Sequence, residues 1–343
     1  MTAPVAKLLL KVFTYRQLAV GGGFLAGFGY VYCGIGFALS ALPGYIILED
    51  HFQDQFPKAL SASSLFNFIG IAVLPPLLQY LKTLFGSREA FILFGAVTWH
   101  MIPAGFGLRD AVPRGGCIDR PSVSKRHAKT KRDLKFVNKY LSFCSCLFYH
   151  KNYAILVVTE FLSSLIYISW ALFLVSLGTS AGLREESAVI LSTAAGVGSF
   201  LGTALAIGLF HFQKMNAYTS CAVPLLVNGI GLVGLTFARD FNSLLSLTLL
   251  TGFCLGVNIS GMIGIIPSLV CRYHFQQAVV INYFIDGIAY QFGGLISGAI
   301  RDLYGSTLYV YGFAALLSFV ALPWILIWAC NKDPNRECEP DLS

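Results

Sequence analysis

Nine apolar stretches constrain this chain more than any other feature of its sequence. An α-helix needs about 20 apolar residues to cross the hydrocarbon core of a bilayer. Stretches of about that length, with little or no charge, cover residues 18–47, 59–81, 90–108, 153–178, 187–211, 216–238, 242–270, 276–300 and 306–330. Backbone polar groups in lipid must be paired within their own segment, and the ten-residue alternation typical of a membrane barrel is missing. The stretches are therefore predicted to be helices.

The composition agrees with this prediction. Hydrophobic residues make up 56% of the chain and charged residues only 12%, and the mean hydropathy is +0.68. Soluble domains carry about 25% charged residues. The fold class predicted is therefore an all-α membrane protein with about nine transmembrane helices.

A basic segment divides these helices unevenly, with three before it and six after it. Eleven of the 24 Lys and Arg residues lie between Arg109 and Lys151, and such segments normally stay in the cytoplasm. The predicted organisation is a partial N-terminal helical bundle (1–108), a basic cytoplasmic linker (109–151), a C-terminal six-helix bundle (152–331) and a cytoplasmic tail (332–343). Contact with anionic lipid head groups is the second role expected for the linker, and nucleic acid is not expected as a partner.

The first apolar stretch has an unusual length. The uncharged run from Gln17 to Leu48 has 32 residues, which is about 48 Å as a helix. That is too long for one span and too short for two spans with a turn. We interpret it as the beginning of one helix joined to the end of the next.

Two segments resemble a known family of membrane proteins. Residues 33–97 combine a Gly-rich helix, a small-residue-rich helix and an aromatic-Gly-x-Arg turn, with the key positions at His51, Phe52, Ser61 to Ser64, Phe85 to Arg88 and Phe91 to Gly95. Residues 286–319 place glycines and an acid at Gly294, Gly298, Asp302 and Gly305. Together these segments resemble helices four to six and eleven to twelve of the monocarboxylate transporter family of the major facilitator superfamily.

The resemblance implies a major-facilitator-type helical bundle that is N-terminally truncated, with two helices missing and a joint near Tyr32 and Cys33. It implies a plasma-membrane symporter that moves a small organic solute by alternating access between two bundles. A monocarboxylate is one candidate solute. The expected partners are a small organic anion or neutral solute, the lipid bilayer, and a membrane chaperone subunit or a full-length relative. No cofactor is expected beyond a coupled proton. The alternative is a non-transporting truncated protein that binds or regulates a full-length relative.

Two acidic residues lie within the predicted spans, where an ionisable side chain is by default a functional candidate. Asp286 lies near the middle of the eighth span, where a buried carboxylate could carry a proton. The alternative is that Asp286 pairs with Arg272 or forms a hydrogen bond within the bundle. Glu160 lies about two turns into the fourth span, so we expect it to reach the membrane surface or to pair with Lys151.

Amides and aromatic residues complete the candidates for a substrate or proton pathway. Asn67, Asn228 and Asn258 are expected to be buried in three different spans, where they could bind a substrate or join helices, with joining helices favoured. Tyr167 and Trp170 could form a pocket wall, although aromatic residues in helices more often pack.

The fifth span departs from the family pattern. By the resemblance, proton-coupled members carry an Asp there and, four residues later, an Arg that binds the carboxylate substrate. Gly198 and Gly202 stand at those positions in this chain. Glycine cannot replace the bidentate fork of Arg, which argues against lactate or pyruvate transport by that pair. With Ala206 they form a strip of small residues that predicts close helix packing.

Catalysis and metal binding have little support in this sequence. His100, His211 and His274 lie in separate segments without the spacing of metal ligands. Serines and cysteines within the spans have no acid and base at a matching depth. The chain is therefore not expected to be an enzyme or to hold a metal.

Overall fold

The computed structural model describes residues 48, 51–52, 55–98, 151–211, 217–270 and 275–330. The chain divides into two compact units, and the second, residues 54–95 and 115–343, holds almost all of the described residues. Several predictions lie outside the described residues, namely those on the stretch 18–47 with its joint at Tyr32 and Cys33, the linker 109–151, the tail 332–343, Arg272, His100 and His274.

The described ranges are helical throughout and contain no strand. The helices are α3 (Phe56–Phe85), α4 (Ser87–Thr98), α7 (Lys151–Ser180), α8 (Glu185–His211), α9 (Ala217–Phe237), α10 (Phe241–Leu269), α11 (Phe275–Tyr304) and α12 (Leu308–Cys330). Seven of them, all except α4, are long and apolar enough to cross a membrane. The predicted all-α membrane fold class is confirmed.

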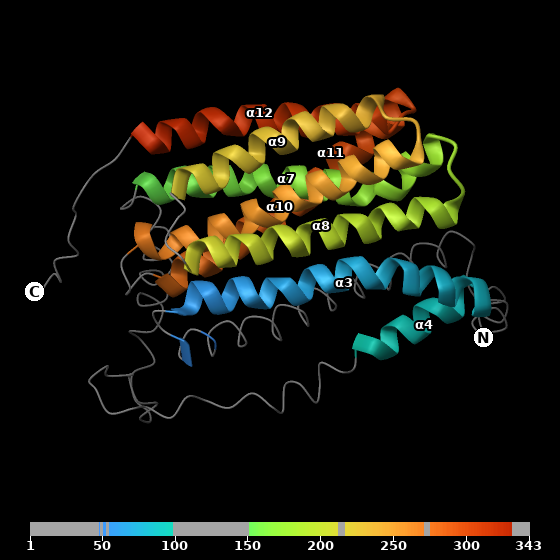
Figure 1. Cartoon of the computed structure of the whole chain (residues 1–343), viewed down its shortest axis with the longest axis horizontal. Coiled ribbons are helices and arrows are strands. Elements are labelled where there is room, and N and C mark those ends of the chain that lie inside the picture. The colour runs from blue at the N-terminus through green and yellow to red at the C-terminus, as the bar shows by residue number, and fades with distance from the viewer. Residues whose placement is uncertain are drawn as a thin grey trace, which may run out of the picture. The chain divides into compact units, whose positions relative to one another are not determined.

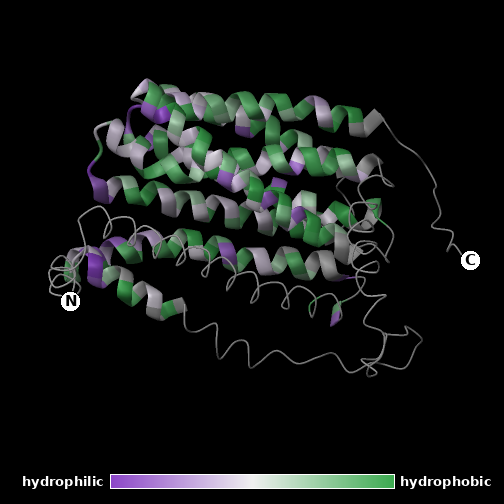
Figure 2. Ribbon diagram, turned by 180° about the vertical axis from the view of Figure 1, so that it is seen from behind, coloured by the Kyte–Doolittle hydropathy of each residue, from purple (hydrophilic) through white to green (hydrophobic). Residues whose placement is uncertain are grey.

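Local sequence explains where these helices begin and end. Gly86 has φ 90°, which favours glycine, and its N–H donates to the Lys82 carbonyl at 3.0 Å, so α3 ends there. Asp240 caps α10 by accepting from the Ser243 N–H at 2.9 Å. This hydrogen bond holds the pKa of the Asp240 carboxyl below its usual value. Hydrophilic residues gather mainly at such helix ends, while the middle of each helix is mostly hydrophobic (Figure 2).

The spanning helices of the second unit run side by side (Figure 1). Helix α8 packs against α3 and α10, α7 packs against α11 and α12, and α9 packs against α10 and α12. Trp170 of α7 and Tyr311 of α12 are among the largest fully buried side chains. The Tyr311 hydroxyl donates to the Trp170 carbonyl at 3.1 Å. The α7–α12 contact therefore gives the buried Tyr311 hydroxyl an acceptor inside the protein.

Helices α8 and α10 approach each other most closely along a strip of glycines, here called the glycine seam. A Cβ atom added to any of its four glycines would collide with a backbone carbonyl oxygen of the other helix: Gly198 with Leu249, Gly202 with Phe253, Gly252 with Ala195, and Gly256 with Ser199. Hydroxyls of α8 also bond across the seam, because Ser199 donates to the Gly252 carbonyl at 3.0 Å and Thr203 to the Gly256 carbonyl at 3.2 Å. The structure thus places Gly198 and Gly202 at a helix contact.

Two alanine substitutions on α8 test the seam. We expect Gly202→Ala to lower the thermal unfolding midpoint of the purified protein, since overpacking costs about 1–3 kcal/mol. Gly208→Ala, the matched control on the same helix, should leave the midpoint unchanged or slightly raised, because a Cβ there meets no atom within 4 Å. Equal midpoints for the two variants would contradict the seam.

Candidate functional site

Two acidic side chains from neighbouring helices meet inside the protein. Glu160 of α7 is only 7% exposed, and its carboxyl group interacts electrostatically with the Asp286 carboxyl group on α11. We call these two residues the carboxyl pair. The prediction that Glu160 reaches the membrane surface is wrong, because α11 packs against α7 and Glu160 is buried beside Asp286. The side chain of Lys151, the other partner predicted for Glu160, lies outside the described side chains.

A serine holds one member of the pair in place. The Ser164 hydroxyl donates to Asp286 Oδ1 at 2.6 Å. Ser164 lies one helical turn after Glu160, so both side chains leave the same face of α7. Arg272, the alternative partner predicted for Asp286, lies outside the described residues.

The other member of the pair has a free acceptor atom. Glu160 Oε2 is buried and has no hydrogen-bond partner among the described residues. A buried acceptor without a donor costs about 1–3 kcal/mol, and more if it is charged. This oxygen can therefore bind a proton or accept a hydrogen bond from a ligand.

Close approach of two carboxyl groups restricts their charge. Two neighbouring negative charges repel strongly where water is scarce, so one carboxyl group holds a proton unless a cation is bound nearby. The carboxyl pair can therefore bind one proton or one positively charged group and release it again.

Tyr290 lies beside the carboxyl pair, and Tyr167 packs against Tyr290. The ring centroids of Tyr167 on α7 and Tyr290 on α11 lie 6.0 Å apart, and Tyr290 interacts with both carboxyl groups and with Ser164. Tyr167 also lies 6.3 Å from Trp170 between ring centroids. Tyr290 is 37% exposed, so the site is accessible from the α11 side.

Polar contacts fix the register of α7 and α11. The Tyr153 hydroxyl donates to the Ala278 carbonyl at 2.8 Å and lies 3.0 Å from Asn282 Oδ1. Farther along, Ser297 donates to the Ser169 hydroxyl at 2.7 Å. The sequence did not predict these contacts, because a single Ser or Tyr in an apolar helix does not indicate which residue it will bond to.

The amide candidates lie in three different settings. Asn228 is buried and donates to the Ser318 hydroxyl at 3.4 Å, which joins α9 to α12. Asn258 is buried in α10, and its Oδ1 has no hydrogen-bond partner among the described residues. Asn67 is exposed, so its predicted burial is wrong. It lies on a face of α3 that α8 does not cover, since α8 packs on α3 at Ala72.

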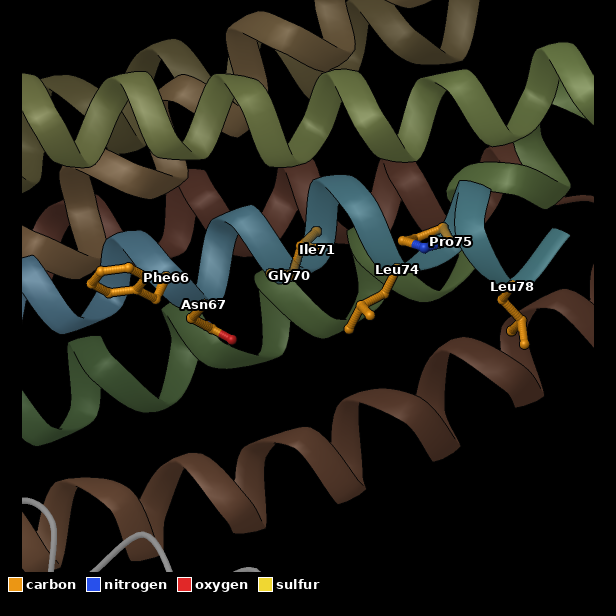
Figure 3. A pocket seen from close by; sticks show the side chains of 7 residues that line it. All are labelled: Phe66, Asn67, Gly70, Ile71, Leu74, Pro75 and Leu78. Carbon is orange, nitrogen blue, oxygen red and sulfur yellow. The ribbon is translucent and has the colours of Figure 1, made fainter. Parts of the chain in front are cut away.

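That face of α3 lines a hollow of about 510 Å³ (Figure 3). Its lining residues all belong to α3 and are Phe66, Asn67, Gly70, Ile71, Leu74, Pro75 and Leu78. None of them belongs to the carboxyl pair. Within the described part of the chain, no three His, Cys, Asp or Glu residues are grouped so that they could hold a metal ion.

Neighbouring serines on α7 test the support of the carboxyl pair. We expect Ser164→Ala to lower the thermal unfolding midpoint, since a hydrogen bond to a charged group contributes about 1.5–3 kcal/mol. Ser163→Ala is the matched control, because the Ser163 hydroxyl is buried without a hydrogen-bond partner among the described residues. A larger loss for Ser163→Ala than for Ser164→Ala would contradict the assigned contact.

Comparison with known proteins places the chain among transporters. No family model matches the chain. Human monocarboxylate transporter 2 is 24% identical over 94% of this chain and 73% of its own length. Rat monocarboxylate transporter 3 is 24% identical over 97% of this chain and 71% of its own length.

A solved structure supports the fold. The crystal structure of the Escherichia coli fucose:proton symporter matches with a TM-score of 0.60 and 15% identity, over 95% of this chain and 79% of that chain. At that identity the match concerns the fold alone. By sequence the chain is similar to monocarboxylate transporters, and its fold resembles that of the fucose:proton symporter, so it is a multi-pass membrane protein whose relatives are transporters and not enzymes.

Proposed function

We propose that this chain moves a small organic solute across the plasma membrane by alternating access, with the carboxyl pair Glu160 and Asp286 binding the coupled proton. The observation that carries the proposal is the burial of these two carboxyl groups against each other between α7 and α11. Ionisable groups are costly inside a membrane and mark ion and substrate pathways. Monocarboxylates are the first solutes to test, because the relatives bear that name.

The position of the proposed site differs from the pattern implied by the family resemblance. Gly198 and Gly202 of α8 supply neither a carboxylate nor a guanidinium group, and both glycines lie against the backbone of α10. Proton binding must then depend on another acid. Among the described spanning helices, Glu160 and Asp286 are the acidic residues placed within a span and away from its ends.

The contact between α3 and α8 is suited to alternating access. These helices come from opposite sides of the basic linker in the sequence, as do the two bundles that move against each other in such transporters. An ion pair joins their ends, with Lys82 Nζ 2.9 Å from Glu185 Oε1. Both side chains are about half exposed, at 45% and 55%. Such a pair contributes about 0.2–1 kcal/mol, which is weak enough to break in each cycle.

Transport by purified full-length chain in sealed vesicles tests the proposal. We expect saturable uptake of a small organic solute that changes with pH in the native chain and has a weakened or shifted pH dependence in Asp286→Asn, since the amide cannot take up a proton and only Glu160 still titrates. Glu186→Gln is the matched control, because this exposed residue at the start of α8 lies outside the site.

Two results would contradict the proposal. Unchanged pH dependence in Asp286→Asn would remove the proton role of the pair. No saturable flux of any organic solute, with correct membrane insertion demonstrated, would favour the alternative of a non-transporting protein that binds or regulates a full-length relative.

A charge swap tests the role of the ion pair. We expect Lys82→Glu and Glu185→Lys each to change the maximal transport rate by up to about fivefold, because 1 kcal/mol corresponds to a factor of about five. The double variant should restore the native rate, and high salt should reduce all these effects. A double variant no better than either single variant would show that the pair does not contribute to the cycle.

A further inference from the structure

We infer that the solute carries an ammonium or guanidinium group, which binds to the carboxyl pair beside the ring of Tyr290. This inference rests on the proposed function and names the substrate class of the same site. It departs from the sequence-based expectation of an organic anion or neutral solute unless the solute also bears a carboxylate, as a zwitterion does.

The first argument is the sign of the charge in the site. Glu160 of α7 and Asp286 of α11 supply two neighbouring carboxyl groups. Every described Lys or Arg side chain is exposed and lies at or near a helix end, namely Lys82, Arg88, Arg184, Arg239 and Arg301. A free carboxylate entering the site would meet like charge and no counter-charge among the described residues. A cation would meet two opposite charges.

The second argument is the unused hydrogen-bonding capacity of the site. Glu160 is more than nine-tenths buried and its Oε2 has no donor among the described residues. Ammonium has three N–H donors and guanidinium presents a planar fork that matches a carboxylate. Either group would satisfy this oxygen, whereas a carboxylate anion brings no donor.

The third argument is the pair of aromatic rings. Tyr290 interacts with both carboxyl groups, and the ring of Tyr167 packs against it with ring centroids 6.0 Å apart. Aromatic faces attract ammonium and guanidinium groups by cation–π interaction, and more strongly where water is excluded. A site with carboxyl groups and aromatic rings is therefore complementary to an organic cation in both charge and surface.

Proton and solute compete for this site. A cation binds the ionised pair, so a proton held by the carboxyl groups is released as the cation enters, and the charge stays balanced. The other titratable groups that interact with the pair are the Tyr290 hydroxyl, which also interacts with Tyr167, and the Cys221 thiol of α9. Cation binding should therefore strengthen as pH rises through the titration of the carboxyl pair. A carboxylate that enters together with a proton would show the opposite trend.

Binding to the detergent-purified full-length chain tests the inference without requiring transport. The probes are methylguanidinium chloride and n-butylammonium chloride, with sodium butyrate as the anionic counterpart. We expect both cations to raise the thermal unfolding midpoint, since a ligand stabilises the state that binds it, and to do so more at mildly alkaline than at mildly acidic pH. They should also slow the reaction of the pair with a hydrophobic carbodiimide.

Variants assign the effect to the site. Glu160→Gln and Asp286→Asn should each weaken cation binding about tenfold or more, and Tyr290→Leu about threefold to tenfold. Tyr290→Phe, which keeps the ring, should bind within about twofold of the native chain, and the exposed control Glu186→Gln should bind like the native chain. Retained cation protection in Glu160→Gln and Asp286→Asn would overturn the inference.

The two proposals fail in different ways. Stabilisation by butyrate alone, together with butyrate flux that responds to pH through Asp286, would overturn the cation site and leave the proposed transport intact. Cation binding that depends on the carboxyl pair, in a chain without flux, would support the site and contradict the transport function.

Discussion

The scarcity of water in the bilayer core is the physical constraint on which this structure depends. A polar group there must find its partner within the protein. The contact between α7 and α11 follows this rule through the Tyr153 bond to Ala278 and the Ser297 bond to Ser169. The same contact contains the exception, since Glu160 Oε2 has no donor among the described residues. The helix contact that pairs these polar groups thus leaves a strong acceptor for a ligand or a proton.

Helix α8 serves for close packing against α10. Its glycines allow the backbone of α10 to approach, and its hydroxyls Ser199 and Thr203 bond to carbonyls across the seam. A position packed directly against the backbone of a neighbouring helix has no room for a long charged side chain. The positions at which the family resemblance implies an Asp and an Arg are Gly198 and Gly202 here, so α8 packs while acidic groups lie on α7 and α11.

The carboxyl pair links charge to conformation in the proposed transporter. Two carboxyl groups at one point change their net charge when they gain or lose a proton or a cation. Asp286 is partly exposed and Glu160 is buried, so the pair lies where a ligand can reach one member while the other remains in the protein interior. Opening of the contact between α3 and α8 would break the weak Lys82–Glu185 ion pair at its end, together with the packing of Gly196 on Ala72.

The sequence by itself determined the helices, because about 20 apolar residues between polar segments have one stable form in lipid. The predicted spans after residue 151 match α7 to α12 within a few residues, and the strip at Gly198 and Gly202 predicted a close helix contact. Only the tertiary structure decided which polar residues meet. Glu160 and Asp286 are 126 positions apart, and the packing of α11 on α7 brings them together. The same packing turned Glu160 inward, and the uncovered face of α3 left Asn67 exposed, because burial depends on neighbouring helices that no local pattern specifies.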